Sequence, residues 1–440
     1  MKVDLNYGKG KIAVTVDDKR VAGVLRQKPG EIIAHPDRAL LAALDHPIGC
    51  GPLRGLCGKG KRACVVVSDI TRPVPHPVVL PVLLHYLEAH QVKRSDISIL
   101  IATGMHRPCE GPELVELLGE KVATKYRIVN HNPSEEKSLK QLGVTSRGTK
   151  IRVNRLYLDA DIKILTGLIE PHFMAGYSGG RKAICPGISG IESLQYSHGV
   201  ECLGSPQAVS GVLAGNPFHE EALEVAKAAG ADFLVNFVIG EDRGIMGIFA
   251  GDLVKAHERG CAFVDEHFQV PLEEPADIVL TSNAGYPLDI NFYQTVKGLV
   301  AALPALKKEG ILKSLASALP SLKKDSTIII VSRCSEGVGS ERFVGLLKEL
   351  KGMKKPADFL AAHKNNFVPD QWEVQELIKV LDKAKFQIYS EGLSSEDAEL
   401  CAGEKIDSIE KALEAAFKRH GRRSKVVIIP EGPYLMPVQK

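Results

Sequence analysis

Short apolar runs, separated by longer stretches of helical periodicity, dominate the hydrophobic pattern of this chain. The apolar runs predict β-strands at Ala63–Val67, Ile97–Ala102, Ile162–Thr166, Ile278–Thr281, Thr327–Ser332, Phe386–Tyr389 and Val426–Ile429. Between them, apolar residues recur at helical spacing and predict helices at Pro77–His90, His219–Ala229, Leu253–His267, Phe343–Lys351 and Val374–Lys385. Strands and helices therefore alternate along the chain, which is typical of the α/β class.

The predicted strands are apolar throughout instead of alternating, as expected for parallel strands that are covered on both faces. We therefore predict an α/β fold of two doubly wound, Rossmann-like domains with the active site in the cleft between them. The segment Phe268–Pro275, with its two prolines and two acidic residues, is the expected boundary and hinge. The predicted domains are residues 1–270 with 420–440, and residues 275–418, because we expect the last strand to return to the first sheet.

Polar and charged residues gather directly after four of the predicted strands. They lie in Ser68–Pro75, Thr103–Pro108, Gly167–Phe173 and Ser282–Pro287, the last of which leads to Asn291–Lys297. In open α/β sheets, ligands bind beyond the carboxyl ends of the strands. Three of these segments place a proline directly after a charged residue, which ends the strand sharply. The convergence of such loops indicates a site for a small molecule.

The stretch Pro171–Gly187 is the densest in candidate chemistry. Its glycines Gly176, Gly179 and Gly180 would let backbone N–H groups cup an anion, with charge supplied by Arg181 and Lys182. It is neither a Walker loop nor a dinucleotide fingerprint, because the required spacings are absent. A lysine in this setting is also a candidate for covalent attachment. A mobile glycine loop with two surface cations explains the stretch equally well.

Three histidines, His106, His172 and His198, lie on or near the predicted site, and His198 is expected at the end of a short helix that begins at Ser189–Glu192. Three histidines could bind zinc, although the H-E-x-x-H spacing of zinc enzymes is absent. Two histidines that follow different strands also suit proton transfer on two sides of a substrate at neutral pH. The residues alone leave a metal hydrolase and an acid–base enzyme nearly equally favoured.

Composition narrows the class of protein without naming a function. A formal net charge of +3 in 440 residues argues against a nucleic-acid-binding protein. No apolar run is long enough to span a bilayer, and the start of the chain does not read as a signal peptide. The nine cysteines are scattered and contain no C-x-x-C pair. We therefore expect a cytoplasmic protein with reduced cysteines and no nucleic-acid or membrane partner.

Several motifs together resemble those of the nickel-pincer-nucleotide lactate racemase family. The matching segments are Ser68–Pro73, Ala102–Pro108, Glu170–Phe173, Ser178–Lys182, His198 and Tyr293–Lys297. They run in the family's order at compatible spacing, and the resemblance covers essentially the whole chain. It implies a racemase or epimerase of a small α-hydroxy acid, lactate or a related 2-hydroxy acid.

The resemblance also implies the cofactor and its binding residues. Lys182 is similar to the lysine that holds the nickel-pincer nucleotide, a pyridinium mononucleotide, through a thioamide bond. His198 corresponds to the one protein ligand of nickel, whose other ligands are a carbon and two sulfurs of the cofactor. The stretch that contacts the cofactor corresponds to Asp69, Ile70, Thr71 and Arg72. Enzymes that make the cofactor are the implied partners.

On the substrate side, His106 and His172 resemble the paired acid/bases on opposite sides of the substrate. The implied substrate-binding residues are Arg72, Tyr293, Gln294 and Lys297. The implied reaction is a proton-coupled hydride transfer through a planar keto acid, with hydride returning to the opposite face. A zinc-type hydrolase that uses His106, His172 and His198, and a non-catalytic anion-binding protein, are the competing hypotheses.

Overall fold

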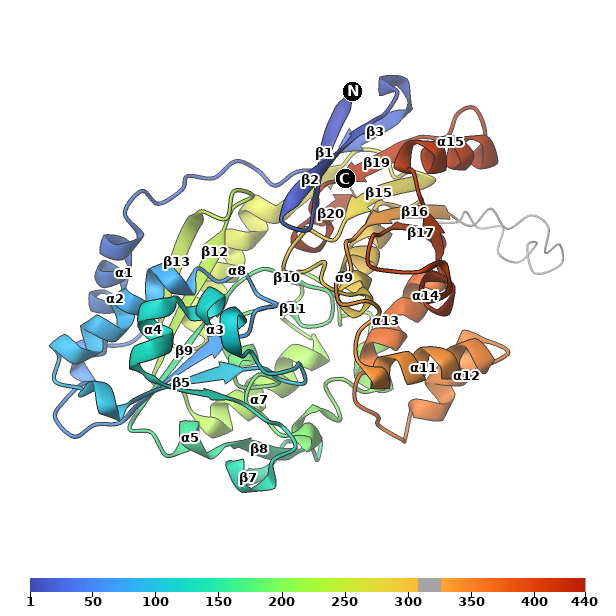
Figure 1. The fold of residues 1–440 in the computed structure, drawn as a ribbon. Coiled ribbons are helices and arrows are strands. Elements are labelled where there is room, and N and C mark those ends of the chain that lie inside the picture. The colour runs from blue at the N-terminus through green and yellow to red at the C-terminus, as the bar shows by residue number, and fades with distance from the viewer. Residues whose placement is uncertain (308–325, 440) are drawn as a thin grey trace. The chain divides into compact units, whose positions relative to one another are not determined.

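The computed structural model describes residues 1–307 and 326–439. The chain forms two compact units by contact, of which one is Pro29–His267 and the other combines Met1–Lys28 with Phe268–Lys440. Each unit has a mainly parallel six-stranded sheet with helices (Figure 1). The predicted α/β class with two doubly wound units is therefore confirmed.

The sheet of Pro29–His267 has the strand order of a dinucleotide-type α/β fold. Its strands are β4 (Ala63–Ser68), β5 (Ile97–Ala102), β6 (Arg127–Asn130), β9 (Ile162–Leu168), β12 (Phe233–Ile239) and β13 (Ile245–Gly251). They lie in the order β13-β12-β9-β4-β5-β6, and all neighbours are parallel except β12 and β13. The chain order therefore reverses between β4 and β9, which is where such sheets bind ligands.

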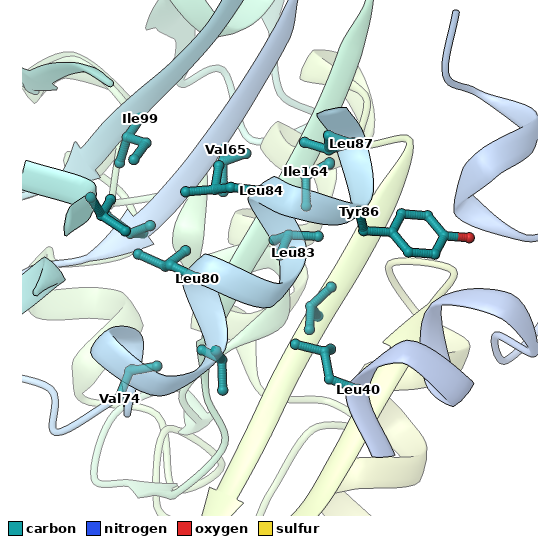
Figure 2. Close-up of a cluster of buried hydrophobic side chains, with 14 of the residues drawn as sticks. Leu40, Val65, Val74, Leu80, Leu83, Leu84, Tyr86, Leu87, Ile99 and Ile164 are labelled. Carbon is teal, nitrogen blue, oxygen red and sulfur yellow. The ribbon is translucent and has the colours of Figure 1, made fainter. Parts of the chain in front are cut away.

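Helices bury the apolar faces of this sheet. Figure 2 shows Leu80, Leu83, Leu84 and Leu87 of α2 in one cluster with strand residues such as Val65. Burying each such leucine contributes roughly 1.5–3 kcal/mol. The helices are α1 (Pro36–Asp45), α2 (His76–Ala89), α3 (Gly111–Leu118), α4 (Glu120–Lys125), α5 (Arg155–Leu158), α6 (Val200–Leu203), α7 (Pro217–Ala229) and α8 (Lys255–Phe268). Two small hairpins pair β7 (Leu139–Val144) with β8 (Lys150–Asn154), and β10 (Pro171–His172) with β11 (Gly176–Tyr177).

The second sheet is entirely parallel. Its strands are β3 (Val21–Val24), β15 (Ile278–Ser282), β16 (Ser326–Val331), β17 (Ala384–Tyr389), β18 (Glu404–Ile406) and β19 (Val426–Ile429), in the order β18-β17-β16-β15-β19-β3. Its described helices of more than one turn are α9 (Phe292–Ala302), α11 (Glu341–Gly352), α12 (Pro356–His363), α13 (Gln371–Leu381), α14 (Ser395–Leu400) and α15 (Ile409–His420). The hairpin of β1 (Lys2–Tyr7) and β2 (Gly10–Thr15) shares a core with this sheet and α15.

The predicted domain composition is wrong at both ends of the chain. Strand β19 does not return to the first sheet, because its ladder partners are β15 on one side and β3 on the other. The final strand β20 (Met436–Gln439) likewise pairs with β14 (Gln269–Leu272). Residues 420–440 and 1–28 therefore belong with the C-terminal sheet, whereas the predicted boundary at Phe268 is close to the observed one.

The predicted elements are present, with shifted ends. Each of the predicted strands occurs within a few residues of its expected place, and β5 and β19 have the expected bounds. The helix expected at Val374–Lys385 ends at Leu381, because the chain enters β17 at Ala384. The prediction omitted the apolar strands β12 and β13 and the short N-terminal strands.

Candidate active site

The predicted polar loops follow strands at the point where the order of the sheet reverses. Asp69 comes directly after β4, His106 lies in the loop after β5, and Glu170 and His172 follow β9. Because β4, β5 and β9 are parallel neighbours, their carboxyl ends meet at one edge of the sheet. These side chains therefore share the ligand-binding edge of the unit Pro29–His267.

Asp69 and His106 form a hydrogen-bonded pair. The Nδ1 atom of His106 lies 2.6 Å from Oδ2 of Asp69, whose side chain is almost fully buried. An ionised carboxylate only accepts hydrogen bonds, so the contact requires the hydrogen of His106 on Nδ1. The neutral ring then has its lone pair on Nε2. A base oriented by a buried carboxylate is the arrangement that general-base catalysis uses.

The surroundings of Asp69 keep it ionised. Burial by itself raises the pKa of this carboxyl, but His106, Thr71 and Arg72 outweigh it, so the pKa lies below its usual value. Thr71 donates to Oδ1 from its hydroxyl at 2.7 Å and from its backbone N–H at 3.2 Å. Ile70 packs against the hydrophobic core beneath the loop. In this predicted cofactor-contacting stretch, Ile70 anchors the loop and Thr71 orients Asp69.

Arg72 points to a second buried carboxylate. Its Nη1 atom lies 3.3 Å from Oε1 of Glu170, and the side chains are 16% and 7% exposed. The Oε2 atom of Glu170 is buried without a hydrogen-bond partner. A buried carboxylate oxygen with no donor is costly unless a bound group supplies one. Glu170 therefore offers an acceptor to a ligand at this edge.

His172 differs from His106 in what faces its ring. The backbone N–H groups of Met174 and Ala175 both donate to its Nδ1 atom, each at 3.2 Å. The ring stacks on Phe173, with centroids 5.1 Å apart and planes at 15°. His172 is buried, and the hairpin of β10 and β11 fixes its backbone.

The glycine stretch is a packed turn instead of an open anion cup or a mobile loop. Residues 170–181 are all buried. A Cβ atom on Gly176 would lie 2.1 Å from the Val212 carbonyl, and one on Gly180 would lie 2.6 Å from the His257 ring. The N–H of Gly180 already donates to Asn236 at 2.8 Å. The glycines are needed for close packing and for positive φ angles.

Arg181 does not offer its charge to a ligand, contrary to the sequence prediction. It is 1% exposed, and its Nη2 atom donates to the carbonyls of Ala175 at 2.6 Å and Tyr177 at 3.0 Å. Its Nη1 atom lies 3.1 Å from Nε2 of His257. Burial lowers the pKa of this guanidinium to about 10. Arg181 therefore holds the backbone of the turn.

The ring of Phe218, near the start of α7, gathers three predicted site residues. The Nζ atom of Lys182 lies 4.7 Å from the ring centroid, in cation–π geometry. The His198 ring packs edge-on at a centroid distance of 4.7 Å, and the His172 ring lies at 6.3 Å. The expected attachment lysine, the expected metal ligand and one expected acid/base thus surround one aromatic side chain.

His198 is kept neutral. Burial first, and then the nearby charge of Lys182, hold the pKa of its imidazole well below the usual value. Its Nδ1 atom lies 2.9 Å from the Ser197 hydroxyl, which fixes the ring orientation. The expected helix end is wrong, because Gly199 is the N-cap of α6 and His198 precedes this helix. A neutral, oriented imidazole is what a metal ligand requires.

Backbone hydrogen bonds connect the loop of His106 to the turn of Lys182. Gly104 donates to the carbonyl of Gly187 at 3.0 Å, and Gly187 donates to the carbonyl of Lys182 at 3.1 Å. Gly104 has a φ angle of +54°, which favours glycine at this position. The Asp69–His106 pair and the cluster around Phe218 are therefore parts of one backbone framework.

Tyr293, Gln294 and Lys297 lie in α9 of the other unit and are all buried. Lys297 donates to the Oε1 atom of Gln294, so the two form a pair on one helical face. The Tyr293 hydroxyl accepts from Nε1 of Trp372 at 2.7 Å. Burial, followed by the nearby carboxylates, raises the pKa of Tyr293, which keeps it protonated. These residues occupy the first half of the helix after β15.

The described residues do not supply a zinc site. Within residues 1–307 and 326–439, no three His, Cys, Asp or Glu side chains are grouped closely enough to hold a metal ion. His106, His172 and His198 therefore do not form the ligand set that a zinc-type hydrolase needs. A metal group that brings its own donors and takes one from the protein fits His198.

Comparison with known proteins identifies the family. The family model of the lactate racemase N-terminal domain matches residues 7–211. The model of the lactate racemase C-terminal domain matches residues 272–319 and 312–436. The chain belongs to the lactate racemase family. The lactate racemases of Thermoanaerobacterium thermosaccharolyticum and Lactiplantibacillus plantarum are each 35% identical to it, over 98% of this chain and 97% and 98% of theirs. Membership of the lactate racemase family makes the chain an isomerase.

One solved structure supports the same assignment, and a second shares the fold. The lactate racemase apoprotein of T. thermosaccharolyticum is 34% identical, covers 100% of both chains and has a TM-score of 0.86. A Thermotoga maritima protein with 18% identity has a TM-score of 0.70 over 92% of this chain and 98% of its own, which shows the fold alone. Every helix among the described residues is too short or too polar to cross a bilayer.

Sequence reasoning did not single out Phe218 or Asn216. Phe218 reads as an ordinary apolar position of an amphipathic helix, and only its neighbours in space reveal its place. Asn216 directly precedes Pro217 and could have been read as a helix N-cap. Its further contacts depend on the tertiary structure.

Proposed function

We propose that this lactate racemase family member racemises or epimerises a small α-hydroxy acid, with lactate or a related 2-hydroxy acid as substrate. The observation that carries the proposal is the grouping of Lys182, His172 and His198 around Phe218. Both named relatives are lactate racemases, which favours lactate as the substrate. Isomerisation of such an acid requires breaking an unreactive C–H bond, which is the kind of chemistry that cofactors supply.

The cofactor that we propose is the nickel-pincer nucleotide, joined to Lys182 through a thioamide and ligated at nickel by His198. The residues fit this group, because the Lys182 amine and the neutral His198 ring lie against the same Phe218 side chain. Asp69, Ile70, Thr71 and Arg72 would line its binding site, and Glu170 supplies an unpaired acceptor. When bound, the group would accept and return the hydride of the substrate α-carbon.

The protein's own task is to handle the proton of the substrate hydroxyl. We propose His106 and His172 as the acid/base pair. With its hydrogen on Nδ1 facing Asp69, His106 uses Nε2 to take the hydroxyl proton, and Asp69 stabilises the resulting imidazolium. His172 would interact with the substrate oxygen on the opposite side. The planar keto acid formed on loss of hydride can then be reduced on either face.

Cations are proposed to bind the substrate carboxylate. Arg72 has further N–H donors beyond the one that faces Glu170, and a guanidinium binds a carboxylate through two parallel hydrogen bonds. Lys297, Gln294 and Tyr293 are the substrate-binding residues that we propose on α9.

The decisive experiment combines intact mass, metal content and a chiral assay. We would coexpress the chain with cofactor-synthesis enzymes, the proposed partners. The expected result is a covalent mass increase on Lys182, stoichiometric nickel, and interconversion of the enantiomers of lactate or another acid in a panel with malate and sugar acids. Protein coexpressed in this way that racemises an acid without a Lys182 adduct would overturn the proposed cofactor.

Matched lysine variants control this test. Lys182→Arg keeps the positive charge over Phe218 but cannot form a thioamide, so it should lose the adduct and the activity. Lys227→Arg on the exposed side of α7 should keep both the adduct and the activity.

All nine cysteines lie in the described residues and are free thiols, which supports the cytoplasm as the proposed location.

A further inference from the structure

The side chain of Asn216 makes four hydrogen bonds in the core of the unit that carries His172. Asn216 is fully buried and is the N-cap of α7, where its Oδ1 atom accepts from the N–H groups of Phe218 at 3.0 Å and His219 at 3.2 Å. Its Nδ2 atom donates to the carbonyls of Met174 and Val212, each at 3.0 Å. All four hydrogen-bonding positions of the amide are therefore used.

One peptide group connects Asn216 to His172. The Met174 carbonyl, which Asn216 holds, belongs to the same peptide plane as the Ala175 N–H, which donates to Nδ1 of His172. A rigid peptide whose carbonyl is fixed has its N–H direction fixed as well. A hydrogen bond at one end of a peptide also polarises the other end, which strengthens donation to the imidazole.

Arg181 holds the next peptide in the same way. Its buried guanidinium donates to the Ala175 carbonyl at 2.6 Å and to the Tyr177 carbonyl at 3.0 Å. Among the described residues, no carboxylate forms an ion pair with Arg181, so its hydrogen bonds to the turn are its main compensation for burial. Asn216 and Arg181 thus fix two successive peptides beside His172.

From these contacts we propose that Asn216 is a positioning residue for His172. It holds the Met174–Ala175 peptide so that its N–H faces Nδ1, and neutral His172 therefore carries its ring hydrogen on Nε2. This tautomer is opposite to that of His106, which has its hydrogen on Nδ1 toward Asp69. The tautomer of His172 does not depend on the proposed function, but its consequence for catalysis does. In that function, neutral His106 and His172 present one ring acceptor and one ring donor to a substrate oxygen.

The test reads the tautomer directly and does not depend on activity. Two-bond ¹H–¹⁵N spectra of the full chain, labelled with ¹⁵N-histidine, report which ring nitrogen carries hydrogen, and His172→Gln identifies the His172 signals. We expect Nδ1 of His172 to resonate as an unprotonated nitrogen and Nε2 as a protonated one. A hydrogen on Nδ1 in the unmodified protein would overturn the inference, whether or not the protein is a racemase.

Asn216→Ser separates the two tasks of the residue. Serine caps helices as well as asparagine, so α7 should persist, but it has no amide donor for the Met174 carbonyl. We expect mixed tautomers at His172, seen as intermediate shifts, and a kcat of the cofactor-loaded enzyme reduced on the order of 10-fold to 100-fold. Unchanged His172 signals in this variant would refute the positioning role.

Two further variants keep the test informative. Asn154 is the N-cap of α5 and its Nδ2 atom lies 3.0 Å from Nδ1 of His131, so Asn154→Ser matches the change away from the site. It should alter the His131 signals and leave those of His172 and kcat unchanged. If Asn216→Ser does not fold, Arg181→Lys loosens the adjacent peptide while it retains the charge. The same mixture of His172 tautomers is expected in this variant. Unaltered His172 signals there would contradict the proposal that the two held peptides set the tautomer.

Discussion

The two histidines proposed to handle protons are held by different kinds of neighbour. A carboxylate lies 2.6 Å from Nδ1 of His106, whereas two backbone N–H groups lie 3.2 Å from Nδ1 of His172. A carboxylate accepts a hydrogen bond and the N–H groups donate one, so the two rings are set in opposite tautomers. Two residues of one type can therefore be given different tasks by the groups that contact their rings.

The largest effect is expected when the acceptor ring is removed. Glutamine retains an N–H donor but has no basic nitrogen, so His106→Gln should lower kcat by about 10³-fold or more. His172→Gln, which keeps a donor, should retain at least about 10-fold more activity than His106→Gln. Steady-state racemisation rates of the two cofactor-loaded variants decide the point. Equal losses in the two variants would contradict the different roles proposed for His106 and His172.

The next largest effect is expected from making His106 resemble His172. In Asp69→Asn, an amide can turn its N–H₂ group toward Nδ1 and move the ring hydrogen to Nε2. The proton acceptor is then lost, and kcat should fall by about 10²-fold to 10³-fold while the fold persists. The ¹⁵N spectrum of His106 provides the structural readout. An unchanged tautomer in this variant would show that Asp69 does not set it.

Buried histidines also make the stability of the unit Pro29–His267 sensitive to acid. Burial lowers the pKa values of five histidines in Pro29–His267. The pKa is about 3 for His76 and His219 and about 4 for His131, and it lies well below the usual value for His198 and His257. The unfolded chain binds protons at these residues below about pH 6.5, whereas the folded chain does not. The free energy of unfolding should therefore fall as the pH drops from 6.5 to 5, by at most about 1.4 kcal/mol per pH unit for a fully buried histidine such as His76 and by less for the partly exposed His219.

Urea titrations at several pH values measure this loss. Far-UV circular dichroism follows both units, while Trp372, the single tryptophan, lies in the other unit and reports on it by fluorescence. We expect the circular dichroism midpoint to shift more with pH than the fluorescence midpoint. A free energy of unfolding that is constant between pH 7 and pH 5 would contradict the prediction.

The smallest effect on function is expected from a change at Phe218, whose ring lies near that of His172. Phe218→Leu removes the ring that contacts Lys182 and His198, at a cost of about 1 kcal/mol beyond lost volume. The nickel content after dialysis should fall severalfold in this variant. Phe233→Leu in β12, a buried phenylalanine of the core, should lower the unfolding midpoint without changing nickel content. Equal nickel retention in both variants would refute the role of the ring.

Much of the fold could be predicted from the sequence, because buried parallel strands read directly as apolar runs. The alternation of β4, β5 and β9 with helices specified the class and the ligand-binding edge. The partners of β19 could not be predicted, since an apolar run indicates that a strand is buried but not which strands it pairs with. The N-terminal β3, which lies beside it, is too short to signal its sheet.

The sequence directed attention to residues that directly follow strands, whose roles stay predictions. Asp69 and His106 lie in loops after β4 and β5, His172 lies in the short strand β10 that follows β9, and the family motifs add Lys182 and His198 as candidates. Arg181 was misjudged, because a sequence records charge but not burial. Phe218 and Asn216 were missed, because α7 meets the His172 turn only in the folded chain.

The pairing of β3 with β19 has a consequence for biosynthesis. The first 28 residues emerge from the ribosome before their sheet partners at residues 426–428 exist. Pro29–His267 is an uninterrupted stretch and can fold as soon as it is complete, since domains form as units during synthesis. The β1–β2 hairpin must wait at least until β15 and β16, which share its core, have been synthesised. We therefore expect the unit that combines Met1–Lys28 with Phe268–Lys440 to be completed last during folding.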